Sequence, residues 1–341
     1  MSDRTEHTPG ECQETDARMD RNLALEVVRA TEAAAMASAR LMGQGDDLAA
    51  DTAAIAAVHR TLTCIGIDGL VTVGEGLEGD APLLFCGQKV GSGTGPRVDL
   101  AIDALEGATI VARGGLNALS AIAMAEPGGF LDPPRVYMDK IAVGPDVPDG
   151  VVDLDAAPGD NLANLAKAKG VPVGDLLVCI LDRPRHEALI GEVRKCGARV
   201  MLIPDGDVSA VIATAAAGID VAPDIYMGLG GAAEGVLAAA ALKCMGGQMQ
   251  GRLRLRDDKD RAAAARRGIT DFDRKYAVGD MARGEVMFAA TGVTPGALLQ
   301  GVRRVPRGIV THSVVMRSKS GTVRFVTAFH DPSRGCPAIP R

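Results

Sequence analysis

Apolar residues first recur at helical spacing and then at strand spacing. Residues 21 to 42 place apolar side chains three and four positions apart and end near Gly43, which predicts an amphipathic helix. A second helix is expected over residues 48 to 63, after the Gly45-Asp46-Asp47 turn. Short apolar alternations then predict strands at residues 70–73, 98–102 and 119–124.

Predicted helices and strands alternate in the second half of the chain. Helices are expected at residues 161–169, 187–196, 208–216 and 233–244, and strands at residues 176–181, 200–203 and 224–227. Such alternation is typical of βαβ units, so we expect a mostly parallel sheet. A strand at residues 287–290 and a hairpin end the pattern, the hairpin being formed by residues 309–316 and 322–329.

A region rich in prolines, from Pro133 to Pro148, is the best candidate for a domain boundary. We therefore expect two α/β subdomains, at residues 21–148 and 149–330. Residues 1–20 are expected to be a disordered tail, because they are polar and acidic and have no apolar segment typical of a signal peptide. Residues 331–341 are expected to form a loose C-terminal tail.

Composition narrows the classes of function. The chain has 341 residues, of which 47% are hydrophobic, but no uncharged apolar run reaches the roughly 18 residues of a spanning helix. A net charge of −6, no Trp and three Tyr argue against a nucleic-acid surface, and the basic residues between 252 and 267 alternate with acids as on a solvated helix face. Seven Cys without C-x-x-C spacing predict reduced thiols and a cytoplasmic protein.

The segment from residue 98 to residue 108 contains the most informative acids. Its apolar alternation stops at Asp103, Glu106 follows three residues later, and Leu105-Glu106-Gly107 is interpreted as the turn that leaves the strand. Two carboxylates held together repel each other unless a cation or a proton intervenes. Taken alone, however, such acids are more often solvated turn residues.

Five acids in all stand at predicted strand ends or in predicted helices: Asp51, Glu75, Asp103, Glu106 and Glu234. Individually, Glu234 could complement a helix dipole and Asp51 could be a surface charge. Since there is no His-rich or Cys-rich cluster, an all-carboxylate set favours Mg²⁺ or Mn²⁺, which usually handle phosphate.

Candidate ligands for an anionic substrate follow later strands. Arg183-Pro184-Arg185-His186 could bind phosphate through its guanidinium groups, or could be a solvated basic loop. Asp205-Gly206-Asp207 could bind sugar hydroxyls, or Asp207 could cap the next helix. The glycine loop from Gly228 to Gly231 could offer N–H groups to an anion. With Ala233 this loop also fits a dinucleotide-binding pattern, which is disfavoured because the expected acid after a following strand is missing.

Seven segments, in order along the chain, resemble class II fructose-1,6-bisphosphatases, some relatives of which also hydrolyse sedoheptulose 1,7-bisphosphate. These segments are Gly74-Glu75-Gly76, Asp103-Ala-Leu-Glu106-Gly107, Tyr137-Met-Asp-Lys140, Arg183-Pro-Arg-His186, Pro204-Asp-Gly-Asp207, Gly230-Gly-Ala-Ala-Glu234-Gly235 and Ala289-Ala-Thr-Gly292. The resemblance covers residues 21 to 329. It implies the layered α/β fold of the lithium-sensitive sugar phosphatases, related to inositol monophosphatase, with two α/β subdomains and the active site between them.

The resemblance also implies roles for individual residues. The metal ligands for Mn²⁺ or Mg²⁺ would be Asp51, Glu75, Asp103, Glu106 and Glu234, of which Glu75, Asp103 and Glu106 would be catalytic. The contacts to a sugar bisphosphate would be Tyr137, Arg183, Pro184, Arg185, Asp205, Gly206, Asp207 and Gly231. The expected reaction is hydrolysis of the C1 phosphate of fructose 1,6-bisphosphate in gluconeogenesis. We also expect a homo-oligomer without nucleic-acid or membrane partners.

The chain departs from the family's pattern at several positions. The family's usual threonine, which helps to position the attacking water, is Ala108, and Thr109 beside it is expected to point elsewhere. Acids are lost at Leu77 and Gly79, a Lys of some relatives is Asp47, and a Pro is Ala233. The changes at Ala108, Leu77 and Gly79 motivate an alternative, a weakened paralogue that binds sugar bisphosphate without efficient turnover. A further alternative is an active phosphatase with another substrate, such as an inositol or nucleotide monophosphate.

Overall fold

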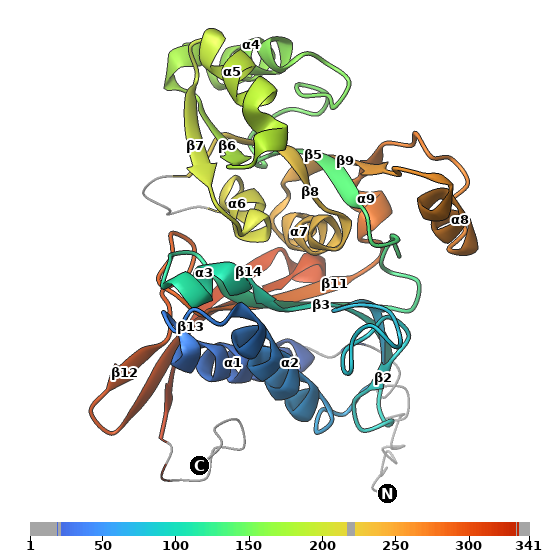
Figure 1. The fold of residues 1–341 in the computed structure, drawn as a ribbon, viewed down its shortest axis with the longest axis vertical. Coiled ribbons are helices and arrows are strands. Elements are labelled where there is room, and N and C mark those ends of the chain that lie inside the picture. Colours follow the sequence, from blue (N-terminus) through green and yellow to red (C-terminus); the bar gives the residue numbers. More distant parts are fainter. Residues whose placement is uncertain (1–18, 20–21, 217–221, 332, 334–341) are drawn as a thin grey trace, which may run out of the picture.

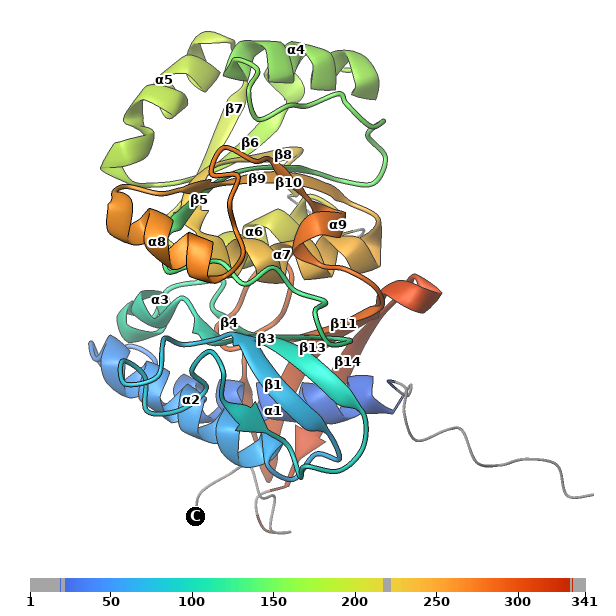
Figure 2. The ribbon, with the colours of Figure 1, turned by 90° about the vertical axis from the view of Figure 1, so that its right-hand side faces the viewer.

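The computed structural model describes residues 19, 22–216, 222–331 and 333. Five layers are stacked in Figures 1 and 2, in the order helices, sheet, helices, sheet, helices. This is the layered α/β architecture expected from the sequence. The expected N-terminal tail lies outside the described residues except for Met19, and most of the expected C-terminal tail does as well. None of the helices in the described part of the chain has the length and apolar character needed to cross a membrane.

The larger sheet has eight strands, in the order β12-β13-β11-β4-β3-β1-β2 with β14 beside β13. Its strands are β1 (Asp68–Val73), β2 (Lys89–Val90), β3 (Arg97–Glu106), β4 (Leu119–Ala125), β11 (Val286–Gly292), β12 (Arg303–Val305), β13 (Gly308–Arg317) and β14 (Thr322–His330). The expected hairpin is confirmed as β13 and β14, which pair from Ile309 with His330 to Arg317 with Thr322.

The second sheet has six strands, in the order β10-β9-β5-β8-β6-β7. Its strands are β5 (Tyr137–Val143), β6 (Leu177–Leu181), β7 (Arg199–Ile203), β8 (Ile225–Gly231), β9 (Gln248–Arg254) and β10 (Tyr276–Ala277). The expectation of a mostly parallel sheet is wrong. Among the named strands of the described residues, parallel pairing is confined to β1·β3, β6·β7 and β6·β8. Strands β5 and β9, which the hydrophobic pattern did not predict, add to this sheet in antiparallel orientation.

Helices form the three other layers, with 3₁₀ turns at several ends. The helices are α1 (Leu23–Ser38), α2 (Asp47–Leu62), α3 (Ala108–Arg113), α4 (Pro158–Lys169), α5 (Glu187–Lys195), α6 (Asp207–Ala213), α7 (Ala232–Met245), α8 (Asp258–Arg266) and α9 (Val278–Met281). The 3₁₀ turns are η1 (Ala39–Leu41), η2 (Val173–Asp175), η3 (Pro184–His186) and η4 (Ser318–Ser320). The expected helices of the first and second halves are all present.

Helix α7 lies between the two sheets with α6 beside it (Figure 1). Its residues from Gly235 to Leu242 are all buried, and four of them in succession, Ala238 to Ala241, are alanines. A helix that is apolar on every side belongs in a core, and small side chains let both sheets approach it closely. Helices α1 and α2 cover the outer face of the larger sheet, and α4 and α5 cover that of the smaller one.

The two sheets do not follow the division expected at residue 148. Strand β5, which begins at Tyr137, already belongs to the six-stranded sheet, and strands β11 to β14 return to the eight-stranded sheet. The prolines at Pro133 and Pro134 mark the crossing between the sheets, whereas Pro145 and Pro148 lie beyond β5, in the connection that leads to α4. The connection from β8 to α7 faces the end of β3. The candidate site forms where these two segments meet.

Candidate active site

A β-bulge in β3 turns two acids toward the same place. Across β3 and β4, Asp103 pairs with Ala121 and Glu106 pairs with Leu119, so three steps along β3 match two along β4. Side chains alternate between faces, so residues three apart would otherwise point to opposite sides of the sheet. The extra residue in β3 brings Asp103 and Glu106 back to the same face of the sheet. The turn predicted at residues 105–107 is confirmed only at Gly107, because the strand continues through Glu106.

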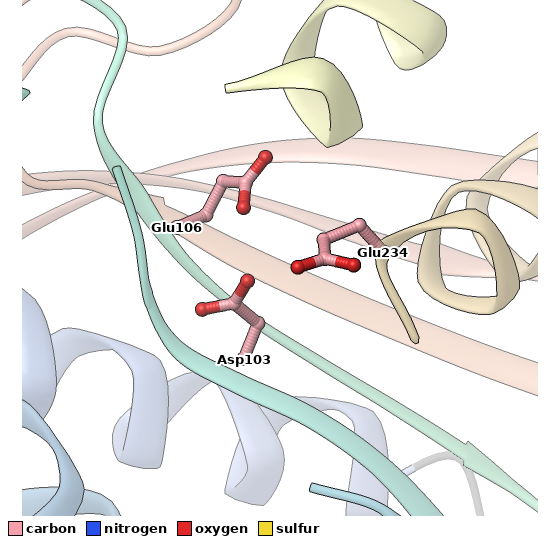
Figure 3. Close-up of side chains that lie close together, drawn as sticks. All are labelled: Asp103, Glu106 and Glu234. Atoms are coloured by element: carbon pink, nitrogen blue, oxygen red, sulfur yellow. The ribbon is translucent and has the colours of Figure 1, made fainter. Parts of the chain in front are cut away.

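Asp103 and Glu106 meet a third acid, Glu234, from the first turn of α7 (Figure 3). One carboxylate oxygen from each of the three lies within 4.8 Å of the others. Burial, followed by the charge of Glu106, raises the pKa of Asp103 well above its usual range. Burial and then the charge of Asp207 raise the pKa of Glu106 to about 8. The same two causes raise the pKa of Glu234.

Two further acids line the same pocket, whose volume is about 590 Å³. Glu75 follows β1, and its Oε1 accepts a hydrogen bond of 2.8 Å from the backbone N–H of Ala104. Burial is the largest cause that raises the pKa of Glu75 to about 7, and the charge of Asp51 adds to it. Burial and then the charge of Asp47 also raise the pKa of Asp51, which lies on α2. The structure thus brings all five predicted acids to one pocket.

The chemistry of this donor set fits a hard divalent cation. Five carboxylates line one pocket, and burial is the largest cause that raises the pKa of each of them. No adjacent cation among the described residues compensates their charge in full. Lys140, a buried cation near Glu234, is committed to an ion pair with Asp207. Oxygen ligands of this type suit Mg²⁺ and Mn²⁺.

The Lys140–Asp207 pair was not predicted from the sequence, although Lys140 lies in a quoted segment. Both side chains are almost fully buried, and Lys140 Nζ also donates to the Gly231 carbonyl at 3.1 Å. The Tyr226 hydroxyl donates to Asp207 Oδ2 at 3.3 Å. Asp207 is the first residue of α6, whose N-cap is Gly206 with no capping side chain, so the interpretation of Asp207 as a helix cap is wrong.

Thr109 lines the pocket beside Ala108 and connects α3 to the segment between β7 and α6. Its hydroxyl donates to Asp205 Oδ2 at 2.9 Å, while Asp205 Oδ1 accepts the N–H of Gly206 at 3.2 Å. The expectation that Thr109 points elsewhere is therefore wrong. Position 109 is the second residue of α3, and the turn of this helix directs successive side chains along the pocket rim rather than to opposite sides.

Tyr137 lines the pocket, whereas Arg183 and Arg185 lie outside the residues that line it in the described structure. The guanidinium carbon of Arg185 lies 4.8 Å from the centre of the Tyr137 ring, and its Nε and Nη2 donate to the Leu229 carbonyl at 3.0 and 2.8 Å. Arg183 Nη1 donates to the carbonyl of its neighbour Asp182 at 3.3 Å. The basic segment thus borders the pocket at the Tyr137 side.

His186 holds this basic segment against β8. The backbone N–H of Leu229 donates to His186 Nε2 at 2.8 Å, so Nδ1 carries the proton and donates to the Leu181 carbonyl at 2.7 Å. Burial lowers the pKa of His186, which agrees with a neutral ring. Its role in the structure is to fix the position of Arg183 and Arg185.

The expected glycine loop at residues 228–231 is wrong, because β8 runs through Gly231. The glycines are needed because side chains approach the strand closely. A Cβ at Gly230 would lie 2.0 Å from Asp207 Oδ2, and one at Gly231 would lie 1.8 Å from Glu234 Oε2. Since the glycines are strand residues beside carboxylates, the dinucleotide-binding interpretation does not hold.

Comparisons with known proteins agree with this geometry. A family described as bacterial fructose-1,6-bisphosphatase, glpX-encoded, matches residues 21–330. The chain belongs to this family. Fructose-1,6-bisphosphatase 1 class 2 of Escherichia coli (strain K12) is 42% identical over 334 residues, covering 94% of this chain and 98% of the relative. Fructose-1,6-bisphosphatase class 2 of Shigella flexneri has the same identity and coverage.

Two of the five departures from the family pattern, Ala108 and Ala233, line the pocket. Ala108 lines the pocket as the first residue of α3, after Gly107 with a φ of 90°. Leu77 is partly exposed, and a Cβ at Gly79 would meet no atom within 4 Å. The changed loop is therefore exposed at both positions and follows Glu75 directly along the chain.

Proposed function

We propose that this protein hydrolyses the C1 phosphate of fructose 1,6-bisphosphate in a reaction that depends on Mg²⁺ or Mn²⁺. The observation that carries the proposal is the convergence of five acids on one pocket in a chain of the class 2 fructose-1,6-bisphosphatase family. Sedoheptulose 1,7-bisphosphate, which has the same arrangement of two phosphates on a sugar, is a second candidate substrate.

The acids would hold the cation and orient the reacting groups. Asp103, Glu106 and Glu234 form the centre of the set, and Glu75 and Asp51 complete it. When bound, the divalent cation supplies charge stabilisation for the phosphoryl oxygens and activates water as a nucleophile. The hydrogen bonds from Ala104 to Glu75 and from Val208 to Glu106, at 2.8 and 3.0 Å, fix these carboxylates before substrate binds.

The substrate would lie between the acids and the Tyr137 side of the pocket. The proposed contacts are Tyr137, Arg183, Pro184, Arg185, Asp205, Gly206, Asp207 and the backbone of Gly231. Two guanidinium groups at one end suit a second phosphate, which favours a bisphosphate over an inositol or nucleotide monophosphate. The buried pair of Asp207 with Lys140 also holds the 205–207 turn from within.

The test is release of inorganic phosphate from fructose 1,6-bisphosphate with Mg²⁺ and with Mn²⁺, beside sedoheptulose 1,7-bisphosphate and a monophosphate panel. Glu106→Gln removes one carboxylate charge at the centre of the site and is expected to lower kcat at least about 100-fold. Glu192→Gln, an exposed residue of α5, is the matched control. Absence of release by the wild-type protein, or equal activity of the two variants, would refute the proposal.

The comparisons lend no support to the alternative of a weakened paralogue, which rests on Ala108 and the changed loop at residues 77–80. The two ideas predict different results in the same experiment. An active enzyme turns over fructose 1,6-bisphosphate, whereas a binding paralogue would bind it in calorimetry without releasing phosphate.

We also propose a cytoplasmic homo-oligomer. The cysteines of the described residues are free, as in a reducing compartment. Strand β14 lies at a sheet edge and exposes Phe325 and Phe329, which supports association between copies. Light scattering is expected to give a mass that is a multiple of the 35.1 kDa of the single chain, and a mass of one chain at micromolar concentration would contradict this.

A further inference from the structure

Two arginines line the pocket that holds the five acids, and they differ in what they contact. Arg256 donates from Nε and Nη2 to the carboxylate of Asp260, at 2.9 and 3.4 Å, so its charge is compensated. Within the described part of the chain, the guanidinium of Arg135 makes no hydrogen bond. Its one ion pair, from Nη1 to Asp80 Oδ2, spans 3.9 Å between side chains that are 66% and 60% exposed. Such a pair contributes little, so the Arg135 donors are free.

The position of Arg135 places these donors beside the metal acids. Nη1 lies 3.6 Å from where a Cβ would stand on Gly76, the residue after Glu75. Pro133 and Pro134 precede Arg135 and β5 begins two residues after it, so its backbone is held between a rigid segment and a sheet.

We propose that Arg135 binds the phosphoryl group that is transferred, through charge-assisted hydrogen bonds to its oxygens. This inference rests on the proposed function. A phosphoryl group held near Glu75 lies beside Arg135, whereas Arg183 and Arg185 border the pocket at Tyr137 and serve the other phosphate. A planar guanidinium with free donors suits phosphate, and it matches charge that spreads over the phosphoryl oxygens in the transition state.

The changed loop gives this arrangement a reason that is particular to this chain. Leu77 and Gly79 stand where the family pattern has acids, and Asp80 keeps only the long ion pair with Arg135. An acid at position 77 would follow Gly76, against which Arg135 lies, and would compete with phosphate for the guanidinium, whereas a Cβ at Gly79 would meet no atom within 4 Å. Loss of the acid at position 77 leaves the Arg135 charge available to the substrate.

The experiment compares Arg135→Gln and Arg135→Lys with Arg97→Gln in the Mg²⁺-loaded protein. Arg97 is a matched control because its one ion pair, to Asp68, also spans 3.9 Å and its side chain is 80% exposed, but it does not line the pocket. We expect Arg135→Gln to lower kcat/KM for fructose 1,6-bisphosphate about 10- to 100-fold, the effect of losing a charge-assisted hydrogen bond. Arg135→Lys should recover part of the loss, and Arg97→Gln should change nothing.

Product inhibition identifies which phosphate Arg135 contacts. Inorganic phosphate occupies the place of the transferred group, and fructose 6-phosphate occupies that of the sugar and the remaining phosphate. Arg135→Gln should raise the inhibition constant of inorganic phosphate about 10-fold or more and leave that of fructose 6-phosphate unchanged. The inference is overturned if fructose 6-phosphate is weakened equally, or if Arg135→Gln behaves like Arg97→Gln.

Failure of the proposed function gives a different result. If the wild-type protein releases no phosphate from fructose 1,6-bisphosphate, the proposed function fails. Calorimetry with inorganic phosphate and Mg²⁺ then tests the role of Arg135 without turnover. Weaker phosphate binding by Arg135→Gln than by Arg97→Gln supports the inference, and equal binding overturns it.

Discussion

Binding of Mg²⁺ by the five acids is expected to weaken steeply as the pH falls from about 8.5 to about 6. A carboxylate must lose its proton before it can bind a cation, so raised pKa values oppose binding at lower pH. Burial, the largest cause in both cases, raises the pKa of Glu75 to about 7 and that of Glu106 to about 8 in the metal-free protein. The perturbation is therefore the pH itself, with the protein unchanged.

The two pKa values set the size of the effect. Near pH 6, roughly one molecule in 1,000 has both Glu75 and Glu106 ionised, whereas near pH 8.5 about three quarters do. The apparent affinity for Mg²⁺ should therefore fall by about two to three orders of magnitude. The raised pKa values of Asp103, Glu234 and Asp51 act in the same direction.

Calorimetry in two buffers of different ionisation enthalpy measures the affinity and the number of protons released. When Mg²⁺ binds, Glu75 and Glu106 should together release about two protons near pH 6 and about a quarter of one near pH 8.5. Glu106→Gln should release about one proton fewer near pH 6, and Glu192→Gln should release as many as the wild-type protein. Equal affinity at both pH values, with no proton release near pH 6, would refute the reasoning.

The same pKa shifts determine whether the metal-free protein becomes more or less stable as the pH rises. Glu75 and Glu106 keep their protons in the folded chain at pH values where the unfolded chain has lost them. Their contribution to the free energy of unfolding is therefore greatest below about pH 4.5 and is lost as the pH rises through about 7 and 8. Mg²⁺ should consequently raise the melting temperature more near pH 8.5 than near pH 6.

Three further changes have defined outcomes. Ala108→Thr places a hydroxyl at the start of α3, where it lines the pocket. This change is expected to raise kcat about 100-fold, the lower range for a positioned proton-transfer group. An unchanged kcat would show that this position does not limit turnover. Thr109→Val removes the 2.9 Å hydrogen bond to Asp205 and should raise KM about 2- to 10-fold, whereas Thr109→Ser should keep the wild-type KM; equal values for both would contradict a role for the hydroxyl. Lys140→Met leaves Asp207 buried without its partner and should lower the free energy of unfolding by about 3–5 kcal/mol in denaturant titration, and a loss below about 1 kcal/mol would be inconsistent with a buried pair.

Most local elements followed from the hydrophobic pattern. Helices α1 and α2 have apolar residues at helical spacing, and α4 to α7 alternate with β6 to β8 as expected. The pattern missed β5 and β9, because side chains such as Lys140 and Arg252 interrupt the apolar alternation. Arg252 is held by Asp155 at 2.7 Å and Lys140 by Asp207, and both partners are distant in the sequence.

The sequence by itself determined which acids are present and which family's motifs they belong to, and it indicated a hard divalent cation. The tertiary structure alone decided that Asp103 and Glu106 face Glu234, since a bulge in β3 sets their phase. It also decided that Thr109 contacts Asp205 and that, among the described residues, Arg135 makes only a long ion pair, to Asp80. Residue types and spacing are local properties, whereas charge compensation depends on neighbours that only the folded chain brings together.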